Sequence, residues 1–301
     1  MHHSKYDVII IGGSFSGLSA AMALGRSMRS VLVIDSGRPC NRQTPATHNV
    51  ITLDGEKPGN IILAAKKQVL LYDTVFLIND EAKSARQEGP DFVVTTASGQ
   101  SQKARKLIIT SGIKDIMPDI EGFTECWGIS ILHCPYCHGY EVINKKTGIL
   151  SIDEMAFDFT KMISHWTKHL TLFTNGKSPL SEKQKEVLKD RNIKVVESEL
   201  LSIHHEDGYV KTVNFKDDST LSLEALYTRL PFEQNSGIPE ALGCKINDDG
   251  YIEIDEFQRT SISGLYAAGD NTTPFRSVSA AMASGNMAGA FVNKELIEED
   301  F

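Results

Sequence analysis

Two cysteines near the middle of the chain, three positions apart, carry the clearest chemistry in the sequence. They are Cys134 and Cys137 in the run His133-Cys134-Pro135-Tyr136-Cys137-His138. A Cys-x-x-Cys pair can close a small disulfide ring, and its thiolate is the species that attacks or leaves. Neighbouring groups control that thiolate, and here the neighbours are His133 and His138. The pair therefore favours thiol–disulfide exchange.

The same spacing also occurs in zinc sites, where it supplies half of the ligands. A structural zinc ion needs four ligands, commonly from a second Cys-x-x-Cys or from two histidines at a fixed spacing. The other cysteines, Cys40, Cys126 and Cys244, stand alone, and His204 and His205 are adjacent. We therefore expect redox chemistry and no metal.

An apolar strand over residues 6–11 opens the chain and leads into Gly12-Gly13-Ser14-Phe15-Ser16-Gly17 and an alanine-rich helix over about 18–26. Such a turn points backbone N–H groups and the positive end of the helix at a pyrophosphate. The dinucleotide fingerprint has glycine at the first, third and sixth positions, and Ser14 replaces the third with another small residue. By itself the turn could be an ordinary strand-to-helix connection.

The segments that follow strengthen the dinucleotide interpretation. A second apolar strand, residues 31–35, ends in Asp35, where an acid would bind the ribose hydroxyls of an adenosine. The polar stretch 36–54 is too long for an idle connection in an α/β unit, and such loops usually carry function. A later buried strand, residues 106–112, ends in small residues that let a ligand pass closely.

The remaining pattern alternates between helices and strands. Helices are predicted at about residues 59–71, 155–165, 181–189 and 278–296, and strands near 75–77, 92–96, 147–150, 169–174, 194–196, 210–215, 225–230, 250–255 and 264–270. The last strand ends at Asp270, which we interpret as the partner of a cofactor hydroxyl. The simpler alternative makes Asp270 a helix N-cap or turn residue.

A second nucleotide-binding start, residues 147–165, lacks the glycines that such a site requires. Where they should stand, the chain reads Ser151-Ile152-Asp153-Glu154-Met155-Ala156. Asp153 and Glu154 would place two negative charges against a pyrophosphate, and this repulsion is costly in a partly desolvated site. The sequence therefore predicts a nucleotide-binding scaffold that does not bind NADPH in the ordinary way.

Composition sets further limits. The chain has 301 residues, enough for two domains, with the 41% hydrophobic and 23% charged residues of a globular protein. A net charge of −8 without a Lys/Arg cluster argues against nucleic-acid binding, and no apolar run has the length of a membrane span. Five cysteines do not suggest a secreted disulfide scaffold, so we expect a cytoplasmic protein.

The order of these motifs resembles the low-molecular-weight thioredoxin reductase family of flavoproteins over nearly the whole chain. The Gly12–Gly17 turn, Asp35, Thr110-Ser111-Gly112 and Cys134-x-x-Cys137 come first, and the run from Arg259-Thr260-Ser261 to Tyr266-Ala267-Ala268-Gly269-Asp270 is the most specific match. The resemblance implies an α/β fold of two Rossmann-like, three-layer ββα domains. A FAD-binding domain, about 1–117 and 245–301, would be interrupted by a degenerate nicotinamide-type domain, about 118–244, that carries the dithiol.

The resemblance also implies roles for particular residues. FAD would be bound by Gly12, Ser14, Phe15, Ser16, Gly17, Asp35, Ser36, Asn41, Arg42, Asn49, Ser111, Gly112, Gly269, Asp270 and Val278. Cys137 would lie nearer the flavin, and Cys134 would meet the substrate. A homodimer is implied as well, together with a swivel between domains that moves the dithiol between flavin and partner.

One departure from the family pattern concerns the residue after the dithiol. The reductases carry an aspartate there as acid–base residue, whereas this chain has His138. The run Cys-Pro-Tyr-Cys-His-Gly-Tyr-Glu is similar to the dithiol oxidase branch that closes disulfides in fungal epidithio natural products. An imidazole can stabilise an adjacent thiolate and exchange a proton near neutral pH, so His138 joins Cys134 and Cys137 as a catalytic candidate. A surface histidine without a role is the alternative.

Three functions are compatible with these observations. The first is a FAD-dependent thiol–disulfide oxidoreductase that acts through Cys134 and Cys137 on a thioredoxin-like protein or a small dithiol or disulfide, without ordinary NADPH binding. The second is a true thioredoxin reductase that takes electrons from ferredoxin, free flavin or an atypically bound nicotinamide. The third, a non-catalytic flavin-binding regulatory protein, is disfavoured because such a protein need not keep a reactive dithiol.

Overall fold

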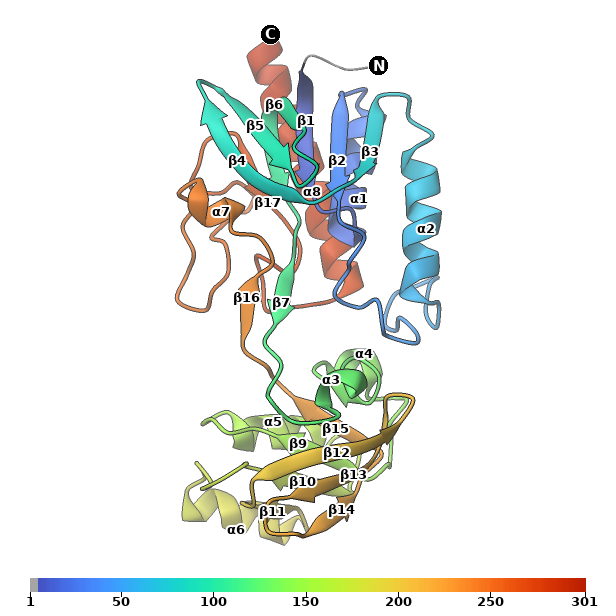
Figure 1. Ribbon diagram of the computed structural model, residues 1–301, viewed down its shortest axis with the longest axis vertical. Helices are drawn as coiled ribbons and strands as arrows, with labels where there is room; N and C mark the ends of the chain where they lie inside the picture. Colours follow the sequence, from blue (N-terminus) through green and yellow to red (C-terminus); the bar gives the residue numbers. More distant parts are fainter. Residues whose placement is uncertain (1–4) are drawn as a thin grey trace. The chain divides into compact units, whose positions relative to one another are not determined.

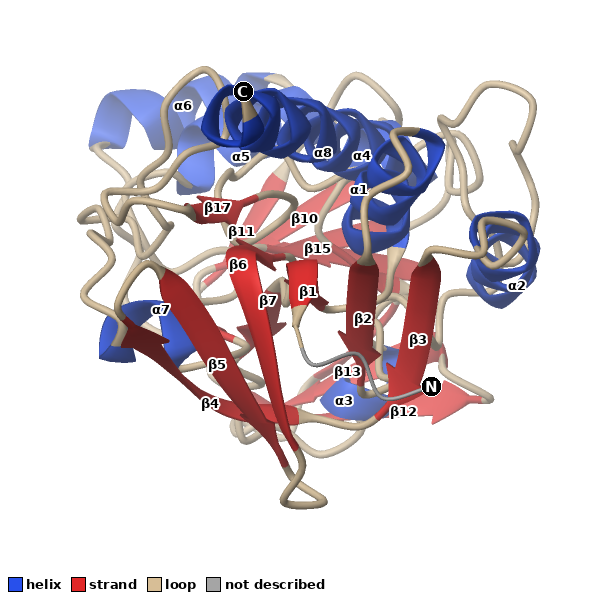
Figure 2. Ribbon diagram, turned by 90° about the horizontal axis from the view of Figure 1, so that it is seen from above, coloured by secondary structure: helices blue, strands red, loops and turns tan. Residues whose placement is uncertain are grey.

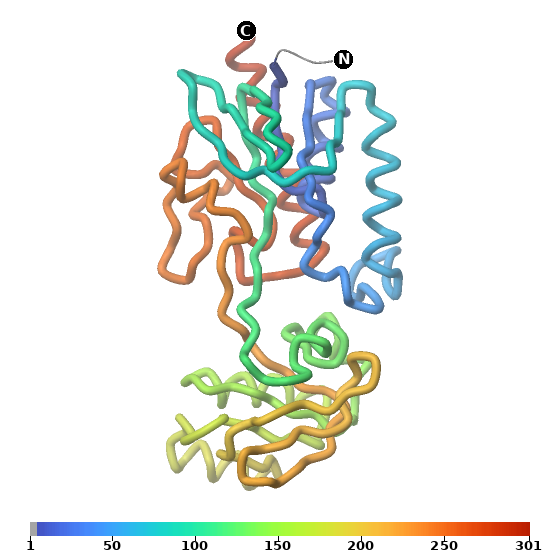
Figure 3. The backbone as a smooth tube through the Cα atoms, in the orientation of Figure 1, coloured from blue at the N-terminus to red at the C-terminus, as the bar shows by residue number. Residues whose placement is uncertain are grey.

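The computed structural model describes residues 5–301 and divides into two compact units. The first unit comprises the chain up to Arg42, Val50–Lys114 and Phe232–Phe301, and the second comprises Gln43–Asn49 and Asp115–Pro231. Figure 3 traces the chain as it leaves the first unit in green and returns in orange. Residues 1–4, with which the expected segment 1–117 begins, lie outside the described range.

The boundaries of the inserted unit differ from the expected 118–244. The chain re-enters the first unit at Phe232, where β16 (Phe232–Gln234) pairs with β7 (Ile113–Asp115). Gln234 Nε2 then donates hydrogen bonds to the carbonyl oxygens of Gly250 and Asn271, at 2.8 and 3.1 Å. These contacts attach the returning segment to the first unit earlier than the sequence predicts.

Parallel strands form the centre of the first unit (Figure 1). The strands are β1 (Tyr6–Ile11), β2 (Val31–Asp35), β3 (Val75–Asn79), β4 (Ala82–Glu88), β5 (Asp91–Thr96), β6 (Ser101–Ile109) and β17 (Leu265–Ala267). Their order is β3-β2-β1-β6-β5-β4, with β17 also paired to β6, and only the β4–β5 and β5–β6 pairings are antiparallel. The apolar sequences of β1 and β2 suit strands that are buried on both faces.

Helices α1 (Phe15–Arg26) and α8 (Val278–Asp300) cover one face of this sheet, and α2 (Pro58–Val69) packs against α1 (Figure 2). Glycines let α8 approach α1 closely. A Cβ on Gly285 would collide with the carbonyl oxygen of Ser16, and one on Gly289 would lie 2.7 Å from that of Ala20. A second core cluster, with Phe92 from β5 and Ile238 from α7 (Ile238–Ala241), fills the other face.

The second unit repeats this layering. Its sheet has the order β11-β10-β9-β15-β8, all parallel, from β8 (Ile131–Leu132), β9 (Thr147–Leu150), β10 (Leu170–Phe173), β11 (Lys194–Val196) and β15 (Ala225–Thr228). One core cluster joins this sheet to α5 (Ala156–Ile163) and α6 (Glu182–Asp190). Another joins it to an antiparallel sheet of β12 (Leu200–Glu206), β13 (Tyr209–Phe215) and β14 (Thr220–Ser222). The predicted α/β class with parallel sheets is confirmed.

One predicted strand, residues 250–255, is absent from the described chain, where only an isolated bridge joins Ile246 to Ile252. The Asn247 side-chain oxygen accepts the N–H groups of Asp249 and Tyr251, which closes a turn instead. Conversely, the sequence does not predict β4, because its residues, Ala-Lys-Ser-Ala-Arg-Gln-Glu, lack an apolar run. Among residues 5–301, no helix combines the length and apolar character that a membrane span requires.

Candidate functional site

The dithiol lies on a short helix of the second unit. Helix α4 (Pro135–His138) follows β8, and Cys134 is its N-cap residue. Cys134 and Cys137 form a disulfide, with their Cα atoms 5.3 Å apart. The backbone N–H of Cys137 donates to Cys134 Sγ at 3.2 Å. A hydrogen bond to sulfur favours the thiolate, so reduction of the disulfide leaves Cys134 in an environment that supports the reactive form.

Aromatic side chains surround the helix. Tyr136, between the two cysteines, is 63% exposed, and its ring meets the ring of Trp166 edge-on at 5.5 Å. Gly139 allows this packing, because a Cβ there would lie 2.5 Å from Trp166 Nε1. A hollow of about 590 Å³ opens beside Tyr136, lined also by Asp158, Lys161, Met162, His165 and Trp166. This volume is typical of small-molecule sites.

His138, the third catalytic candidate, ends helix α4 and is partly buried. Burial lowers the pKa of His138, the nearby His48 lowers it further, and the charge of Glu141 opposes both effects. The net shift of this pKa is downward, so the neutral imidazole is favoured near neutral pH. A neutral imidazole can accept a proton, which is the role that the sequence assigns to His138.

The expected second nucleotide turn holds a carboxylate of the chain itself. Asp153 Oδ1 accepts the hydroxyl of Ser151 and the backbone N–H of Met155, both at 3.1 Å. These donors lie just before α5, where a pyrophosphate would accept backbone N–H groups. Asp153 and Glu154 are both exposed and add negative charge at this point. The turn therefore does not fit a nicotinamide dinucleotide in the ordinary way.

The glycine turn of the first unit, in contrast, has the close packing of a dinucleotide site. Gly12 has a φ of +107°, and a Cβ there would collide with the carbonyl oxygen of Thr110. A Cβ on Gly17 would collide with the carbonyl oxygen of Gly12. The turn is thus pressed against the ends of β1 and β6, with α1 starting at Phe15 behind it.

Buried polar atoms near this turn also fit a bound cofactor. The hydroxyl oxygens of Ser16 and Ser111 and the side-chain carbonyl oxygen of Asn271 are buried without a hydrogen-bond partner among residues 5–301, as is that of Asn41 in the loop after β2. Gly269 brings the C-terminal segment to the same place, since a Cβ on it would lie 3.1 Å from Ser16 Cβ. Buried polar atoms normally have partners, so these atoms suit a ligand with hydroxyl and phosphate groups.

Asp35 lies at the end of β2 as predicted, and its carboxylate is already engaged. Oδ1 accepts the N–H groups of Gly13 and Gly37, each at 3.2 Å, and Oδ2 accepts Lys66 Nζ at 2.7 Å. A carboxylate offers about four acceptor positions, so one remains for a ribose hydroxyl. Lys66, on α2, is not predicted by the sequence and neutralises this acid.

Four other residues that the sequence predicts to bind the cofactor lie at or near the ends of helices and strands of the first unit. Ser14 is the N-cap of α1, Val278 is the first residue of α8, and Gly112 follows β6 with a φ of +68°. Asp270 accepts the Cys40 thiol at 3.9 Å and lies 3.8 Å from Arg276 Nε. Helix α8 has Ser277 as its N-cap, so Asp270 does not cap that helix, but it does lie in the turn that the Thr272 N–H closes on the Gly269 carbonyl oxygen.

Three further residues that the sequence predicts to bind the cofactor belong to the long polar loop. Ser36 and Arg42 are exposed in the first unit. Asn49 has a φ of +60° and belongs to the second unit, so the structure does not group it with the other predicted cofactor residues.

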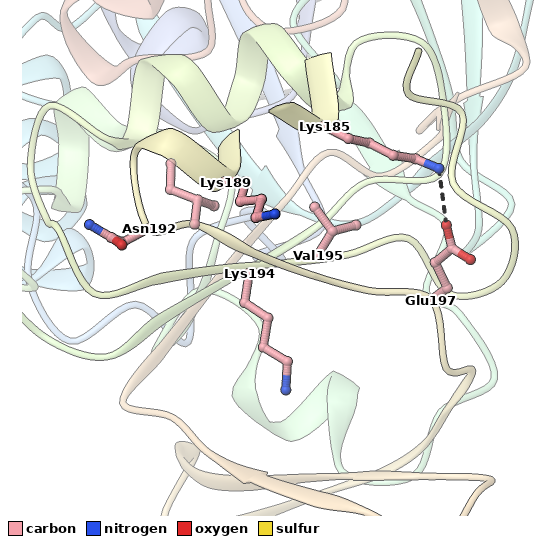
Figure 4. Close-up of a pocket in the computed structure, with 7 residues that line it drawn as sticks. Lys185, Lys189, Asn192, Lys194, Val195 and Glu197 are labelled. Carbon is pink, nitrogen blue, oxygen red and sulfur yellow. Dashed lines mark ion pairs between the residues drawn. The ribbon is translucent and has the colours of Figure 1, made fainter. Parts of the chain in front are cut away.

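A hollow of about 540 Å³ in the second unit is lined by Lys185, Lys189, Asn192, Ile193, Lys194, Val195 and Glu197 (Figure 4). Lys185 reaches Glu197 at 3.8 Å. Strand β11 is the edge strand of its sheet, and lysines on an edge discourage pairing with other chains. We therefore assign this hollow no ligand. Within the described residues, no three His, Cys, Asp or Glu side chains gather as metal ligands.

A unit with a dinucleotide turn and a unit with a Cys-x-x-Cys disulfide together define a disulfide oxidoreductase of the two-domain flavoprotein class. The chain belongs to the pyridine nucleotide-disulphide oxidoreductase family, whose model matches residues 6–285. It is an oxidoreductase enzyme of the thioredoxin reductase type, as predicted.

Named relatives agree with this assignment. The chain is 30% identical to thioredoxin reductase tcpT of Claviceps purpurea, over 97% of this chain and 95% of that protein. It is 30% identical to thioredoxin reductase sirT of Leptosphaeria maculans, over 99% and 96%. The crystal structure of an oxidoreductase from Agrobacterium tumefaciens superposes with a TM-score of 0.91, at 33% identity, covering 98% of this chain and 99% of that one.

Proposed function

We propose that the protein is a FAD-dependent thiol–disulfide oxidoreductase that works without an ordinary NADPH site. The observation that carries this proposal is the combination in one unit of the Cys134–Cys137 disulfide with a nucleotide turn occupied by Asp153. FAD would be held in the first unit by the Gly12–Gly17 turn, Asp35 and the unpaired hydroxyls of Ser16 and Ser111. When bound, this cofactor supplies a centre that accepts or donates two electrons.

The chain's own part of the reaction is thiol–disulfide exchange. A substrate thiolate attacks Cys134 Sγ, the Cys134–Cys137 bond breaks, and Cys137 leaves as a thiolate. The second substrate thiolate then attacks the substrate sulfur of the mixed disulfide and releases Cys134 as a thiolate, which closes the substrate disulfide. The substrate loses two electrons and two protons, and the dithiol takes up the electrons. His138 in its neutral form can accept one of the protons.

The opposite direction, reduction of a thioredoxin-like disulfide, uses the same bonds in reverse. The names of the relatives tcpT and sirT as thioredoxin reductases favour it as a second candidate. The electron donor would then be ferredoxin, free flavin or a nicotinamide bound in another way. About 30 mV in reduction potential changes the free energy of such a two-electron exchange by about 1.4 kcal/mol, so small differences decide the direction.

An oxygen-uptake assay tests the proposed direction. The purified yellow protein should consume oxygen when a small dithiol is added, and Cys134→Ser or Cys137→Ser should abolish this uptake, because the exchange needs both sulfurs. Cys244→Ala is the matched control, since it removes a buried thiol of the first unit. Uptake that persists in Cys137→Ser would contradict the proposed path.

The family resemblance further supports a homodimer, and the low cysteine count favours a cytoplasmic location. Light scattering on the purified chain would test the first, with a mass near twice 33.2 kDa expected. A mass of one chain at micromolar concentration would contradict it.

A further inference from the structure

The segment Gln43–Asn49 brings a second histidine to the dithiol unit. This segment groups with the second unit, although residues before and after it belong to the first. Gly128 has a φ of +75°, and a Cβ there would lie 3.0 Å from Gln43 Nε2 and 3.1 Å from Thr44 Oγ1. Thr47 is buried. The segment is thus packed in place, and His48 is held with it.

His48 meets two residues of the dithiol motif. Its Nε2 lies 3.5 Å from Glu141 Oε1, and its ring meets the ring of His138 edge-on, with 6.2 Å between the centroids. The His48 side chain is 19% exposed and that of Glu141 39%. The charge of Glu141 also acts on the buried Tyr227 of β15, whose pKa burial raises and Glu141 raises further. The charges of His48 and Glu141 thus both act on His138, which directly follows Cys137 in the chain, and Glu141 also acts on Tyr227.

Two imidazoles and one carboxylate lie close together at this point. A positive charge on either ring disfavours a second one at this distance, whereas Glu141 stabilises the first. Such a group takes up protons in steps that belong to the pair rather than to one residue. When His48 carries the proton opposite Glu141, His138 stays uncharged.

We propose that His48 is a positioning residue for the dithiol: with Glu141 it holds one positive charge, and thereby keeps His138 as an uncharged proton acceptor beside Cys137. In the step that this serves, the S–H bond of a cysteine breaks, the proton moves to the His138 imidazole, and the sulfur keeps the electron pair as a thiolate. The proton then leaves through the histidine pair to solvent. This inference rests on the proposed function, since it assigns the proton that dithiol exchange releases.

The test measures thiolate formation directly, without substrate or electron donor. The protein is reduced with dithiothreitol and desalted without oxygen. The rate of iodoacetamide alkylation of Cys134 and Cys137 is then followed against pH, with the modified cysteine identified by mass spectrometry. His138→Asn should remove one step from the curve of alkylation rate against pH. The step that disappears is the one that belongs to the histidine pair.

His48→Asn should move that step upward by between about 0.5 and 2 pH units, because a unit charge about 6 Å away is removed. His48→Lys keeps a positive charge opposite Glu141 and should leave the step at or below its wild-type pH. His204→Asn, at an exposed position of β12 in the same unit, is the matched control and should change nothing. A step that stays unmoved in His48→Asn, or moves equally in His48→Lys, would overturn the proposal.

A second measurement needs no folded His48 variant. In histidine-labelled wild-type protein, the NMR signal of His48 should show the charged ring over a pH range in which the signal of His138 still shows the neutral ring, because the pair holds its first proton on His48. A charged His138 ring beside a neutral His48 ring would refute the inference. Either negative result leaves dithiol-dependent oxygen uptake unaffected, so failure of this inference is distinguishable from failure of the proposed function.

Discussion

At the scale of single residues, spacing along the chain predicts the disulfide but not its surroundings. Cys134 and Cys137 are local, and a turn of helix brings them together. Glu141 lies in the same motif, so its proximity to His138 is also local. His48 comes from a distant loop, and nothing in its own neighbourhood in the sequence indicates its partner. The length of the loop over 36–54 predicts a function for this stretch but does not identify which residue of the dithiol motif His48 contacts.

Burial predicts which thiols are inert. Cys126 is fully buried, and burial raises the pKa of its thiol to about 11. At about pH 8 only about a thousandth of such a thiol is ionised, and the thiolate is the reactive form. In the reduced protein at about pH 8, iodoacetamide should therefore modify Cys134 at least about a hundred times faster than Cys126, as measured by mass spectrometry.

Exposure and thiolate content can be separated in the same experiment. Raising the pH toward about 10 increases the thiolate fraction of Cys126, but iodoacetamide still reaches this buried side chain only when the fold opens. Mild urea, which favours opening, should therefore increase the labelling rate of Cys126 further. Equal rates for Cys126 and Cys134 in the folded protein would contradict the burial argument.

At the scale of elements, small residues fix how helix α8 lies on α1. The carbonyl oxygen of Ser16 occupies the place of a Cβ on Gly285. Gly285→Ala should therefore destabilise the protein by about 1–3 kcal/mol, because the helices must separate. Since Ser16 belongs to the glycine turn, this variant should also lose FAD more easily. Thermal unfolding and the ratio of flavin to protein after gel filtration measure the two effects.

Gly59, in the first turn of α2, is the matched control. No atom lies within 4 Å of a Cβ built on it. Alanine is favoured over glycine in a helix by about 0.5–1 kcal/mol, so Gly59→Ala should raise the melting temperature slightly. Equal effects of the two substitutions would show that α8 does not depend on close approach at Gly285.

A buried lysine joins β6 to helix α8. The Lys106 side chain is 6% exposed and contacts the carboxylates of Glu295 and Glu299, and Glu295 also accepts the hydroxyl of Tyr266. Lys106→Met would remove the buried cation of Glu295 and leave Arg259, whose Nε lies 3.6 Å from the other carboxylate oxygen, so urea unfolding should show a loss of about 1–3 kcal/mol near pH 7. Lys114→Met, which breaks an exposed pair with Glu233, should cost less than about 0.5 kcal/mol.

The contribution of Lys106 should depend on pH. Burial raises the pKa of Glu295, but hydrogen bonds from Lys106 and Tyr266 outweigh it, and the net shift of this pKa is downward. A carboxyl with a lowered pKa in the folded state stabilises the protein above its unfolded pKa, and this stability is lost as the pH falls through the folded value. The difference between wild type and Lys106→Met should therefore narrow below about pH 4. A constant difference down to about pH 3 would contradict this account.

At the scale of the whole molecule, the sequence predicts two α/β units and the order of their motifs. The apolar runs of β1, β2, β9 and β10 make the parallel sheets predictable. The exact return point at Phe232 is not predictable, because it depends on the pairing of β16 with β7 across a long sequence separation. The sequence also does not predict that Gln43–Asn49 packs with the second unit, because this packing depends on residues far along the chain.

The nucleotide turn of the second unit is the place where the proposed loss of NADPH binding can be tested. The sequence predicts the loss of its glycines, and the structure adds that Asp153 takes the backbone N–H of Met155. The double substitution Asp153→Gly and Glu154→Ala removes both carboxylates from the turn. The dissociation constant for NADPH, measured by fluorescence quenching, should then fall at least about tenfold. Identical NADPH binding before and after substitution would show that the acids are not the obstacle.

We propose that electrons reach or leave the protein through the dithiol and not through NADPH. An anaerobic titration of the purified protein, following flavin absorbance on addition of NADPH, then NADH, then dithiothreitol, tests it most directly. We predict no bleaching by stoichiometric nicotinamide, full bleaching by the dithiol, and no bleaching by the dithiol in Cys137→Ser. Stoichiometric bleaching by NADPH would contradict the account and identify an ordinary NADPH-dependent reductase.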